Sequence, residues 1–331
     1  MKAAYIESTG GPEAIRIGDL PIPTPQPGEV LVKVAAASVN PVDTYIRAGK
    51  VAMELPKPSI IGCDLAGTVT AVGEGVQRYK VGDRVWGSNQ GLVGRQGTFA
   101  EFASVHEDWL YTLPDGVKEA DAAALALVGI TAHLGLFWRT QLRPYETVFV
   151  NGGSGGVGLC VVQMAKATGA KVIATAGHPD KIEALKSLGT DLVLNYKTDN
   201  VVDAVKDFTK GHGVNVHYDT VPPTDFDKSV ELMAPRGRMV VMAGRAARPV
   251  FPNGPFYVKA LSLTGFVMFT MTPDEQRVCA DDMNKWMVSG QLKAFIGKTF
   301  TLDEAVEAHK LQEANTTGGA GTLLGKIVVG M

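Results

Sequence analysis

The sequence is poor in the features that mark several large classes of protein. It has 3 cysteines in 331 residues, Cys63, Cys160 and Cys279, which are far apart and odd in number. This argues against a disulfide framework and favours a reducing compartment, so we expect a cytoplasmic protein. The 6 histidines are dispersed and form no spaced pair of the kind that binds a metal.

Neither charge nor hydropathy indicates a nucleic-acid or membrane partner. The 32 basic and 34 acidic residues leave a formal net charge of −2, so no global positive field would attract nucleic acid or an anionic membrane. No apolar run approaches the ~20 residues of a transmembrane helix, and residues 1–7 lack the apolar core of a signal peptide. With 45% hydrophobic residues, the chain is long enough for two domains with their own cores.

The sequence does contain a cluster of glycines between a strand pattern and a helix pattern. Residues 147–150 are of β type, residues 153–158 read G-x-G-x-x-G, and apolar residues then recur at helical spacing. A second strand pattern follows at 171–175, so the whole unit fits within ~30 residues, as in dinucleotide-binding proteins. The glycines there permit a tight turn, the approach of a pyrophosphate and close helix packing, and the helix N-terminus favours the anion. The predicted contacts are Ser154, Gly155, Gly156 and Val157.

The same letters also fit a different turn. Residues 152–156 match G-x-S-x-G, the nucleophile elbow of α/β-hydrolases, which likewise joins a strand to a helix. A serine hydrolase using Ser154 would need an acid and a histidine later in the chain, and Asp219 and His309 are available. This alternative leaves the two extra glycines unexplained.

The rest of the pattern predicts two domains of different fold. Residues 1–121 contain many short strand patterns punctuated by glycine, which indicates a barrel or sandwich, and a short capped helix at 40–49. Six strand patterns then alternate with helix patterns, which predicts a doubly wound parallel sheet. A last β pattern at 325–329 is expected to rejoin the first domain. We therefore expect one domain from 1–121 with 294–331, and another from 122–293.

Several segments carry a resemblance to a known family. Residues 37–43, residues 62–69, the glycine turn and the ending at 325–329 are together similar to the medium-chain dehydrogenase/reductase superfamily. The nearest similarity is to its zinc-free quinone oxidoreductase branch, which includes zeta-crystallin. This implies an α/β protein with a GroES-like β-barrel domain and an inserted Rossmann domain, NADPH as the cofactor, and a homodimer or homotetramer. It also implies a quinone or an activated alkene as electron acceptor.

The resemblance also implies the residues of the site. The positions that match the zinc ligands of related alcohol dehydrogenases hold Asn40, Cys63 and Leu127, of which only Cys63 can bind a metal, so we expect no zinc. In the resembled enzymes a cleft holds NADPH, and the positions matching Asn40 and Tyr45 line its nicotinamide end. Tyr45 is the candidate hydrogen-bond donor to the substrate. Simpler roles are helix capping for Asn40 and packing for Tyr45. Outside the glycine turn, the resemblance implies cofactor contacts at Asn40, Thr131 and Tyr196. Six more are predicted from their positions at or just after the carboxyl ends of strand patterns, where open α/β sheets bind ligands: Gly177, Lys181, Gly244, Arg245, Phe266 and Val267.

The end of the second strand pattern predicts a preference for NADPH over NADH. An acid ~20 residues beyond the glycines binds the ribose 2′-hydroxyl in NAD-preferring proteins, whereas residues 175–178 contain none. Lys181 can reach a 2′-phosphate as a point charge, although its simpler role is that of a solvated helix residue. Asp180 is adjacent, and we expect the helix to turn it away.

Two further interpretations stay open at this point. One is an alkenal or enone double-bond reductase of the same superfamily. The other is a non-enzymatic NADPH-binding or structural protein of the crystallin type, because the glycine turn would be retained in such a protein.

Overall fold

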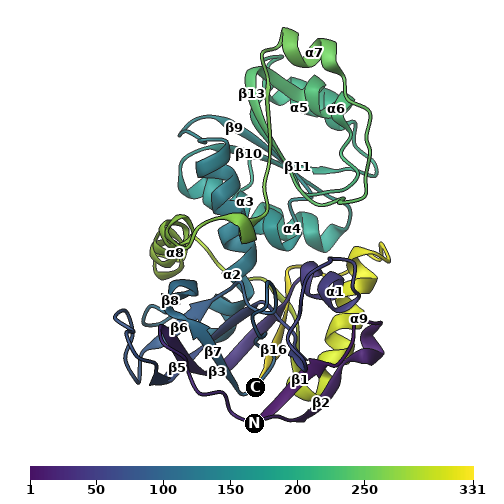
Figure 1. Ribbon diagram of the computed structural model, residues 1–331. Coiled ribbons are helices and arrows are strands. Elements are labelled where there is room, and N and C mark those ends of the chain that lie inside the picture. Colours follow the sequence, from purple (N-terminus) through teal and green to yellow (C-terminus); the bar gives the residue numbers. More distant parts are fainter. The chain divides into compact units, whose positions relative to one another are not determined.

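The computed structural model describes residues 1–331, which divide into two compact units. The first unit comprises Met1–Leu127 and Thr272–Met331, and the second comprises Val128–Met271 (Figure 1). Helix α8 (Pro273–Val288) therefore groups with the first unit, whereas the sequence pattern placed it with the Rossmann sheet. The domain boundaries expected at 121 and 293 stay a prediction.

The first unit is built on two sheets that are mostly antiparallel. The larger sheet has the order β15-β16-β3-β5-β6-β8, with β7 paired to β3, and the smaller has the order β2-β1-β4. Val30, Val32 and Val34 of β3 pack with Leu65 and Val69 of β5 in a buried apolar cluster, because alternate residues of a strand face the same side. The strands of this unit are β1 (Lys2–Ile6), β2 (Arg16–Asp19), β3 (Glu29–Val39), β4 (Ser59–Ile60), β5 (Asp64–Val72), β6 (Arg84–Gly87), β7 (Phe102–His106), β8 (Leu110–Thr112), β15 (Ile296–Thr301) and β16 (Lys326–Gly330).

Two further helices of this unit, α1 (Pro41–Arg47) and α9 (Ala305–Thr316), pack against each other. Helix α1 begins as the sequence predicted, with Asn40 as its N-cap and proline as its first residue. The Asp43 carboxylate accepts a hydrogen bond from the Asn40 backbone N–H at 2.7 Å. The buried Arg47 guanidinium pairs with Glu313 of α9. Because β16 pairs with the end of β3, the C-terminal strand lies directly beside the start of α1.

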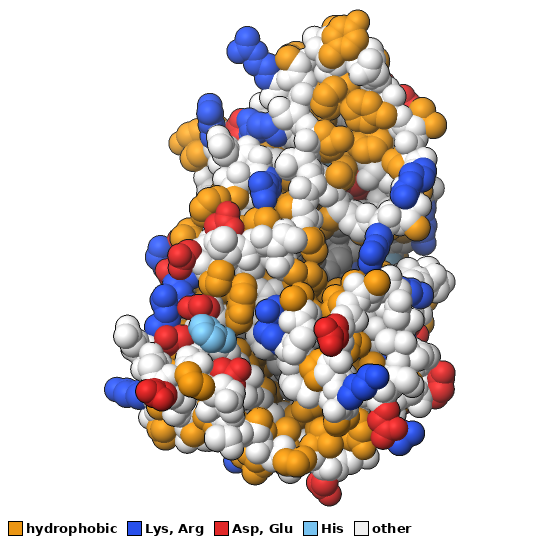
Figure 2. Space-filling model, in the orientation of Figure 1, with side chains coloured by type: hydrophobic (Ala, Val, Ile, Leu, Met, Phe, Trp, Pro, Cys, Tyr) orange, Lys and Arg blue, Asp and Glu red, His pale blue; other side chains and the backbone are white.

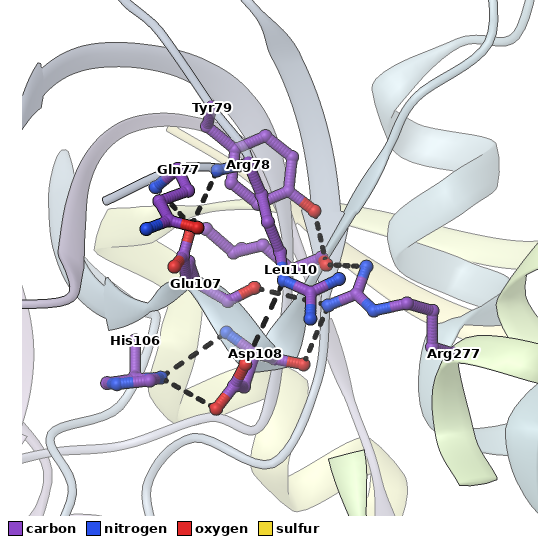
Figure 3. A network of polar contacts seen from close by, with 8 residues as sticks. All are labelled: Gln77, Arg78, Tyr79, His106, Glu107, Asp108, Leu110 and Arg277. Carbon is purple, nitrogen blue, oxygen red and sulfur yellow. Dashed lines mark hydrogen bonds and ion pairs between the residues drawn. The ribbon is translucent and has the colours of Figure 1, made fainter. Parts of the chain in front are cut away.

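Arg277 of α8 donates hydrogen bonds to carbonyl groups at the end of the short turn that follows β7. Figure 3 shows the Arg277 guanidinium directed at the carbonyl groups that follow β7. Its nitrogens lie 3.2 Å from the Leu110 carbonyl oxygen and 3.2 Å from that of Asp108. The Tyr79 hydroxyl donates to the same Leu110 oxygen. A guanidinium is well placed here because the carbonyl end of a helical turn is its negative end. Together with the hydrogen bonds that Asn89 donates to Gln276 and Trp86 donates to Asn284, it holds α8 to the first unit.

The second unit is a parallel sheet of the Rossmann order. Its six strands run β11-β10-β9-β12-β13-β14, and every neighbouring pair is parallel. This order corresponds to 3-2-1-4-5-6 in a dinucleotide-binding sheet, so the predicted doubly wound sheet is confirmed. The strands are β9 (Thr147–Asn151), β10 (Lys171–Ala176), β11 (Leu192–Asn195), β12 (Val214–Asp219), β13 (Met233–Val241) and β14 (Ser262–Gly265).

The remaining helices are α2 (Glu119–His133), α3 (Gly156–Ala167), α4 (Pro179–Ser187), α5 (Val201–Phe208), α6 (Phe226–Leu232) and α7 (Asn253–Val258). Of these, α2 precedes the sheet and the others connect its strands. One helical stretch, Glu119–Arg139, is long and apolar enough to cross a membrane by length and composition, and 72% of its apolar window is buried inside the protein. The sequence reading expected no such stretch. Its burial accounts for its composition, because a helix surrounded by protein is apolar on all sides.

Candidate functional site

Most of the predicted cofactor contacts lie where parallel strands end. Because the six strands are parallel, their carboxyl ends meet at one edge of the sheet, which is where open α/β sheets bind ligands. The residues in question follow β9 (Ser154, Gly155, Gly156, Val157), β10 (Gly177), β11 (Tyr196), β13 (Gly244, Arg245) and β14 (Phe266, Val267). The structure therefore brings these predicted residues to one edge.

Within the glycine turn, some positions have no room for a side chain, whereas Gly155 faces open space. A Cβ atom at Gly158 would lie 2.2 Å from the Gly152 carbonyl oxygen, and one at Gly153 would lie 2.7 Å from the Ala174 Cβ atom. By contrast, a Cβ atom at Gly155 would meet only the Gly152 oxygen, at 3.5 Å. Gly155 is exposed and is the N-cap of α3. The space that a pyrophosphate needs is thus present at the second glycine, so the turn fits a dinucleotide.

Polar side chains at three strand ends hold this turn, and those of Thr175 and Asp219 are buried. The Thr175 hydroxyl accepts from the Gly152 N–H at 3.0 Å and donates to the Asn151 amide oxygen at 3.1 Å. The Asn151 amide nitrogen in turn donates to the Asp219 carboxylate at 2.9 Å. The sequence analysis missed the supporting role of Asn151 and Thr175. The sequence could have indicated this role, because each of these polar residues lies near the end of a mostly apolar strand.

The serine-hydrolase alternative is wrong. His309 is fully buried within the first unit, with its ring 5.8 Å from the Phe99 ring, and neither ring nitrogen has a hydrogen-bond partner. The Asp219 carboxylate supports the glycine turn through Asn151 instead of orienting a histidine. A nucleophilic serine needs a base within hydrogen-bond reach and an acid that orients that base, and neither element of this arrangement exists for Ser154.

His309 instead makes the fold sensitive to acid. Burial, assisted by the Arg47 guanidinium, lowers the pKa of His309 to about 3. The unfolded chain takes up this proton near pH 6.5 whereas the folded chain does not, so the free energy of unfolding falls as the pH falls below 6.5. We expect His309→Leu to remove this loss, which amounts to about 2 kcal/mol between pH 8 and pH 5.

Urea unfolding of the wild type and the His309→Leu variant at pH 8 and pH 5 measures this effect. His212→Gln is the matched control because His212 is exposed. If the wild type and the His309→Leu variant lose the same stability on acidification, His309 is not responsible.

Basic and aromatic side chains gather beyond β10 and β11. A Cβ atom at Gly177 would lie 2.4 Å from the Tyr196 ring, so the ring lies directly against that glycine. Burial and the nearby Lys197 ammonium lower the pKa of Lys181, and the Lys197 ammonium lies 6.0 Å from the centre of the Tyr196 ring. The carboxylate of Asp180 is 85% exposed and lies 3.7 Å from a His178 ring nitrogen. Because the ammonium groups of Lys181 and Lys197 repel each other, an anion bound between them would be stabilising.

Lys197 was not among the predicted residues. The sequence could have indicated Lys197, because it directly follows Tyr196 just beyond the third strand of the unit. The two lysines are brought together by the pairing of β10 with β11, which a local pattern does not reveal.

Thr131 lies in α2, beside a departure from α-helical geometry. The residues that follow, Leu134–Arg139, form a π-helical turn. The buried Tyr218 of β12 donates its hydroxyl hydrogen to the Thr131 carbonyl oxygen at 2.9 Å. Gly135 makes room for this contact, because a Cβ atom there would lie 2.3 Å from the Tyr218 oxygen. Such turns are frequent at functional sites, and neither Tyr218 nor Gly135 carried a signal in the sequence.

The last two strand ends place the other predicted contacts. Gly244 has φ +66°, and a Cβ atom there would lie 2.8 Å from the Pro222 Cβ atom, so this position requires glycine. Arg245 and Val267 are exposed, and Phe266 is partly buried. Their contact with a cofactor stays a prediction.

The two predicted residues of the first unit differ in their surroundings. Tyr45, on α1, is partly buried, and burial raises the pKa of its phenol. Asn40 is fully buried, and its amide has a partner at both ends. The amide nitrogen donates to Asp64 at 2.7 Å, and the amide oxygen accepts from the Lys326 ammonium. The structure therefore holds the Asn40 amide between Asp64 and Lys326. The direct roles of Asn40 and Tyr45 at the nicotinamide stay predictions.

No group of three or more His, Cys, Asp or Glu side chains converges as a metal site in residues 1–331. At the positions that match zinc ligands, Asn40 is committed to Asp64 and Lys326, and Leu127 has no donor atom. We therefore expect elemental analysis of the purified protein to find no stoichiometric zinc and a chelator to leave activity intact. Activity that is lost to chelator and restored by zinc would contradict this prediction.

Comparison with known proteins identifies the family. Residues 26–115 match the family described as alcohol dehydrogenase GroES-like domain, and residues 156–284 match zinc-binding dehydrogenase. A quinone oxidoreductase of Rattus norvegicus is 33% identical over 311 residues, which are 94% of this chain and 93% of that protein. The chain belongs to the medium-chain dehydrogenase/reductase superfamily. Within it, the chain is an oxidoreductase of the quinone oxidoreductase type, so the non-enzymatic interpretation does not hold.

Two further relatives agree with this placement. A quinone oxidoreductase of Pseudomonas aeruginosa is 34% identical over 333 aligned positions, which cover 97% of this chain and 98% of the relative. The structure of Escherichia coli quinone oxidoreductase complexed with NADPH superposes with a TM-score of 0.87 at 28% identity, with all of both chains covered. The predicted combination of a GroES-like domain and a Rossmann domain is confirmed.

Proposed function

We propose that this protein is a cytoplasmic, zinc-independent reductase that uses NADPH to reduce a quinone or an activated alkene. The observation that carries the proposal is the open face at Gly155 in a sheet whose neighbouring strand ends present Lys181, Lys197 and Tyr196. A carboxylate that would bind a ribose 2′-hydroxyl is missing from residues 175–178. The NADPH complex of the Escherichia coli relative supports the choice of cofactor.

Each part of the site has a distinct task in this proposal. The backbone N–H groups at the start of α3 bind the pyrophosphate, and the two lysines with Tyr196 bind the 2′-phosphate. NADPH, when bound, supplies the hydride. Tyr45 donates a hydrogen bond to the oxygen on which the acceptor develops negative charge. The proton that completes the reduction comes from solvent or from a nearby hydroxyl.

A panel of acceptors tests the reaction and its substrate class. We expect the protein to oxidise NADPH in the presence of simple quinones, with a lower kcat/KM for NADH than for NADPH. Alkenals and enones belong in the same panel, because turnover of these alone would favour the double-bond reductase. If NADPH binds and no acceptor is reduced, the proposed reaction is contradicted.

We also propose that two copies of the chain associate through β14. This strand is at the edge of the six-stranded sheet, so one side of its backbone is unpaired, and an unprotected edge favours pairing with another strand. Leu263 of this strand and Tyr257 and Val258 of the adjacent α7 are exposed apolar side chains. Figure 2 shows hydrophobic side chains gathered over the end of the second unit where Figure 1 places α7. A second copy joined at β14 would cover them.

Sedimentation velocity at micromolar concentration tests the association. We expect the wild type to sediment as a dimer or a tetramer, and the Val258→Asp/Leu263→Asp variant to shift towards monomer because buried carboxylates oppose the contact. Val93→Asp is the control, because Val93 is also an exposed apolar side chain but lies in the first unit. A wild type that stays monomeric would contradict the proposal.

A further inference from the structure

A cluster of buried polar side chains lies at the start of α1 and is not explained by the roles above. We call Asn40, Asp43, Cys63, Asp64 and Lys326 the Lys326 cluster, and all five are buried. They come from the end of β3, the first turn of α1, the start of β5 and the start of β16. The sequence patterns pointed to residues at the start of α1 and to Cys63, and none of them indicated Lys326.

Asp64 is the anion of this cluster. Its carboxylate accepts hydrogen bonds from the Ser38 hydroxyl at 2.8 Å, the Asn40 amide at 2.7 Å and the Ser88 hydroxyl at 2.7 Å. Burial raises the pKa of Asp64, and the Lys326 ammonium is the largest influence that opposes the rise. A carboxylate that accepts three hydrogen bonds beside an ammonium is stabilised in its charged form.

Lys326 fixes the orientation of the Asn40 amide. Its ammonium donates to the Val39 carbonyl oxygen at 2.7 Å and to the Asn40 amide oxygen, while the Asn40 amide nitrogen faces Asp64. A flipped amide would direct N–H groups at the ammonium and an oxygen at the carboxylate. Both contacts would be repulsive in a site with little water, so a single orientation is stable.

The charges of the cluster balance only when one proton is retained. Asp43 and Asp64 carry two carboxyl groups, and Lys326 carries one positive charge. Burial raises the pKa of Asp43 to about 7, while the Cys63 thiol and the Asn40 N–H act in the opposite direction. Arg95 also lies close enough to Cys63 to interact with it electrostatically. Near neutral pH, Asp43 therefore exchanges the proton that balances the cluster.

We propose that Lys326 is the internal counter-cation of the candidate active site and acts as a positioning residue for the start of α1. It holds Asn40, which is the N-cap of the helix that carries Tyr45. The part of this inference that concerns catalysis rests on the proposed function. The electrostatic part does not, because it concerns only how two buried carboxylates are neutralised.

A charge-balance cycle tests the electrostatic part without any substrate. Lys326→Met leaves the buried Asp64 carboxylate uncompensated, so we expect the folding equilibrium constant at pH 6, where Asp43 keeps its proton, to fall about 100-fold or more in urea unfolding. Adding Asp64→Asn should recover at least about 10-fold of this loss, because the uncompensated charge is gone and the serine hydroxyls can turn to accept. Lys33→Met is the control, because Lys33 is exposed on β3.

The pH dependence of the free energy of unfolding provides a second, independent test. The folded chain keeps the Asp43 proton up to about pH 7 whereas the unfolded chain loses it near pH 3.8, so this group's contribution to stability is lost as the pH rises from about 4 to 7. The Asp43→Asn variant should lack this loss. If Asp64→Asn fails to rescue Lys326→Met, or if neither protein folds, Lys326 acts through packing and the inference is overturned.

Kinetics test the positioning role where the variants fold. We expect Lys326→Met to lower kcat by about 10-fold or more and Asp64→Asn to restore part of it, while the Kd for NADPH stays within about 3-fold because the phosphate contacts lie in the other unit. A kcat equal to that of the wild type would overturn the positioning role. If the wild type has no reductase activity, the proposed function fails and the urea results still decide the electrostatic part.

Discussion

Replacing Gly155 by valine is expected to lower NADPH affinity about 100-fold or more and to leave the fold intact. A Cβ atom at this position meets only the Gly152 oxygen, at 3.5 Å. The backbone there has φ −76° and ψ 168°, which is an extended conformation that valine adopts readily. The branched side chain would therefore occupy the open face of the turn, where the pyrophosphate has to approach the N–H groups of α3.

Gly158 provides the matched control for this variant. A Cβ atom there would lie 2.2 Å from the Gly152 oxygen and 2.8 Å from the Gly153 Cα atom, so Gly158→Val should destabilise the second unit itself. Calorimetric titration with NADPH and urea unfolding of both variants separate the two effects. Near-normal NADPH binding by a folded Gly155→Val protein would show that the pyrophosphate does not bind at this turn.

Lys181→Ala is expected to weaken NADPH binding by about 10- to 150-fold and to change NADH binding little. A charge-assisted contact with the 2′-phosphate contributes about 1.5–3 kcal/mol, and only NADPH carries this group. The ammonium of Lys197 is close enough to lower the pKa of Lys181. Lys197→Ala should therefore weaken NADPH binding in the same direction, by less because Lys197 is more exposed.

Lys186→Ala is the control for these variants. Lys186 is on the same helix, but its side chain is 60% exposed and lies 3.9 Å from Glu183, so its loss should affect neither cofactor. Titration of NADPH and NADH against the four proteins gives the comparison. Equal wild-type affinities for the two cofactors, or an equal loss of both in Lys181→Ala, would show that Lys181 does not bind the phosphate.

The local features of this protein could be read from the sequence. The glycine turn, the capped start of α1 and the six strands of the second unit were all predicted, because each depends on residues within one or two turns or strands. Periodicity reports which face of an element is buried, and glycine and proline report backbone conformations. The resemblance to a known family then supplied the order of the domains, which the comparisons confirmed.

Contacts between distant residues were decided only by the tertiary structure. Lys326 hydrogen-bonds to Asn40, which is 286 residues away in the sequence. Arg277 joins α8 to the first unit through backbone carbonyl groups, which no sequence pattern marks. The burial of His309 likewise depends on the packing of α9 against Phe99. In the first two cases a polar side chain meets a partner that the folded chain brings to it, and in the third a polar ring is buried without a hydrogen-bond partner. The physical reason is that hydrogen bonds and ion pairs depend on distance in space, whereas sequence patterns record only the spacing along the chain.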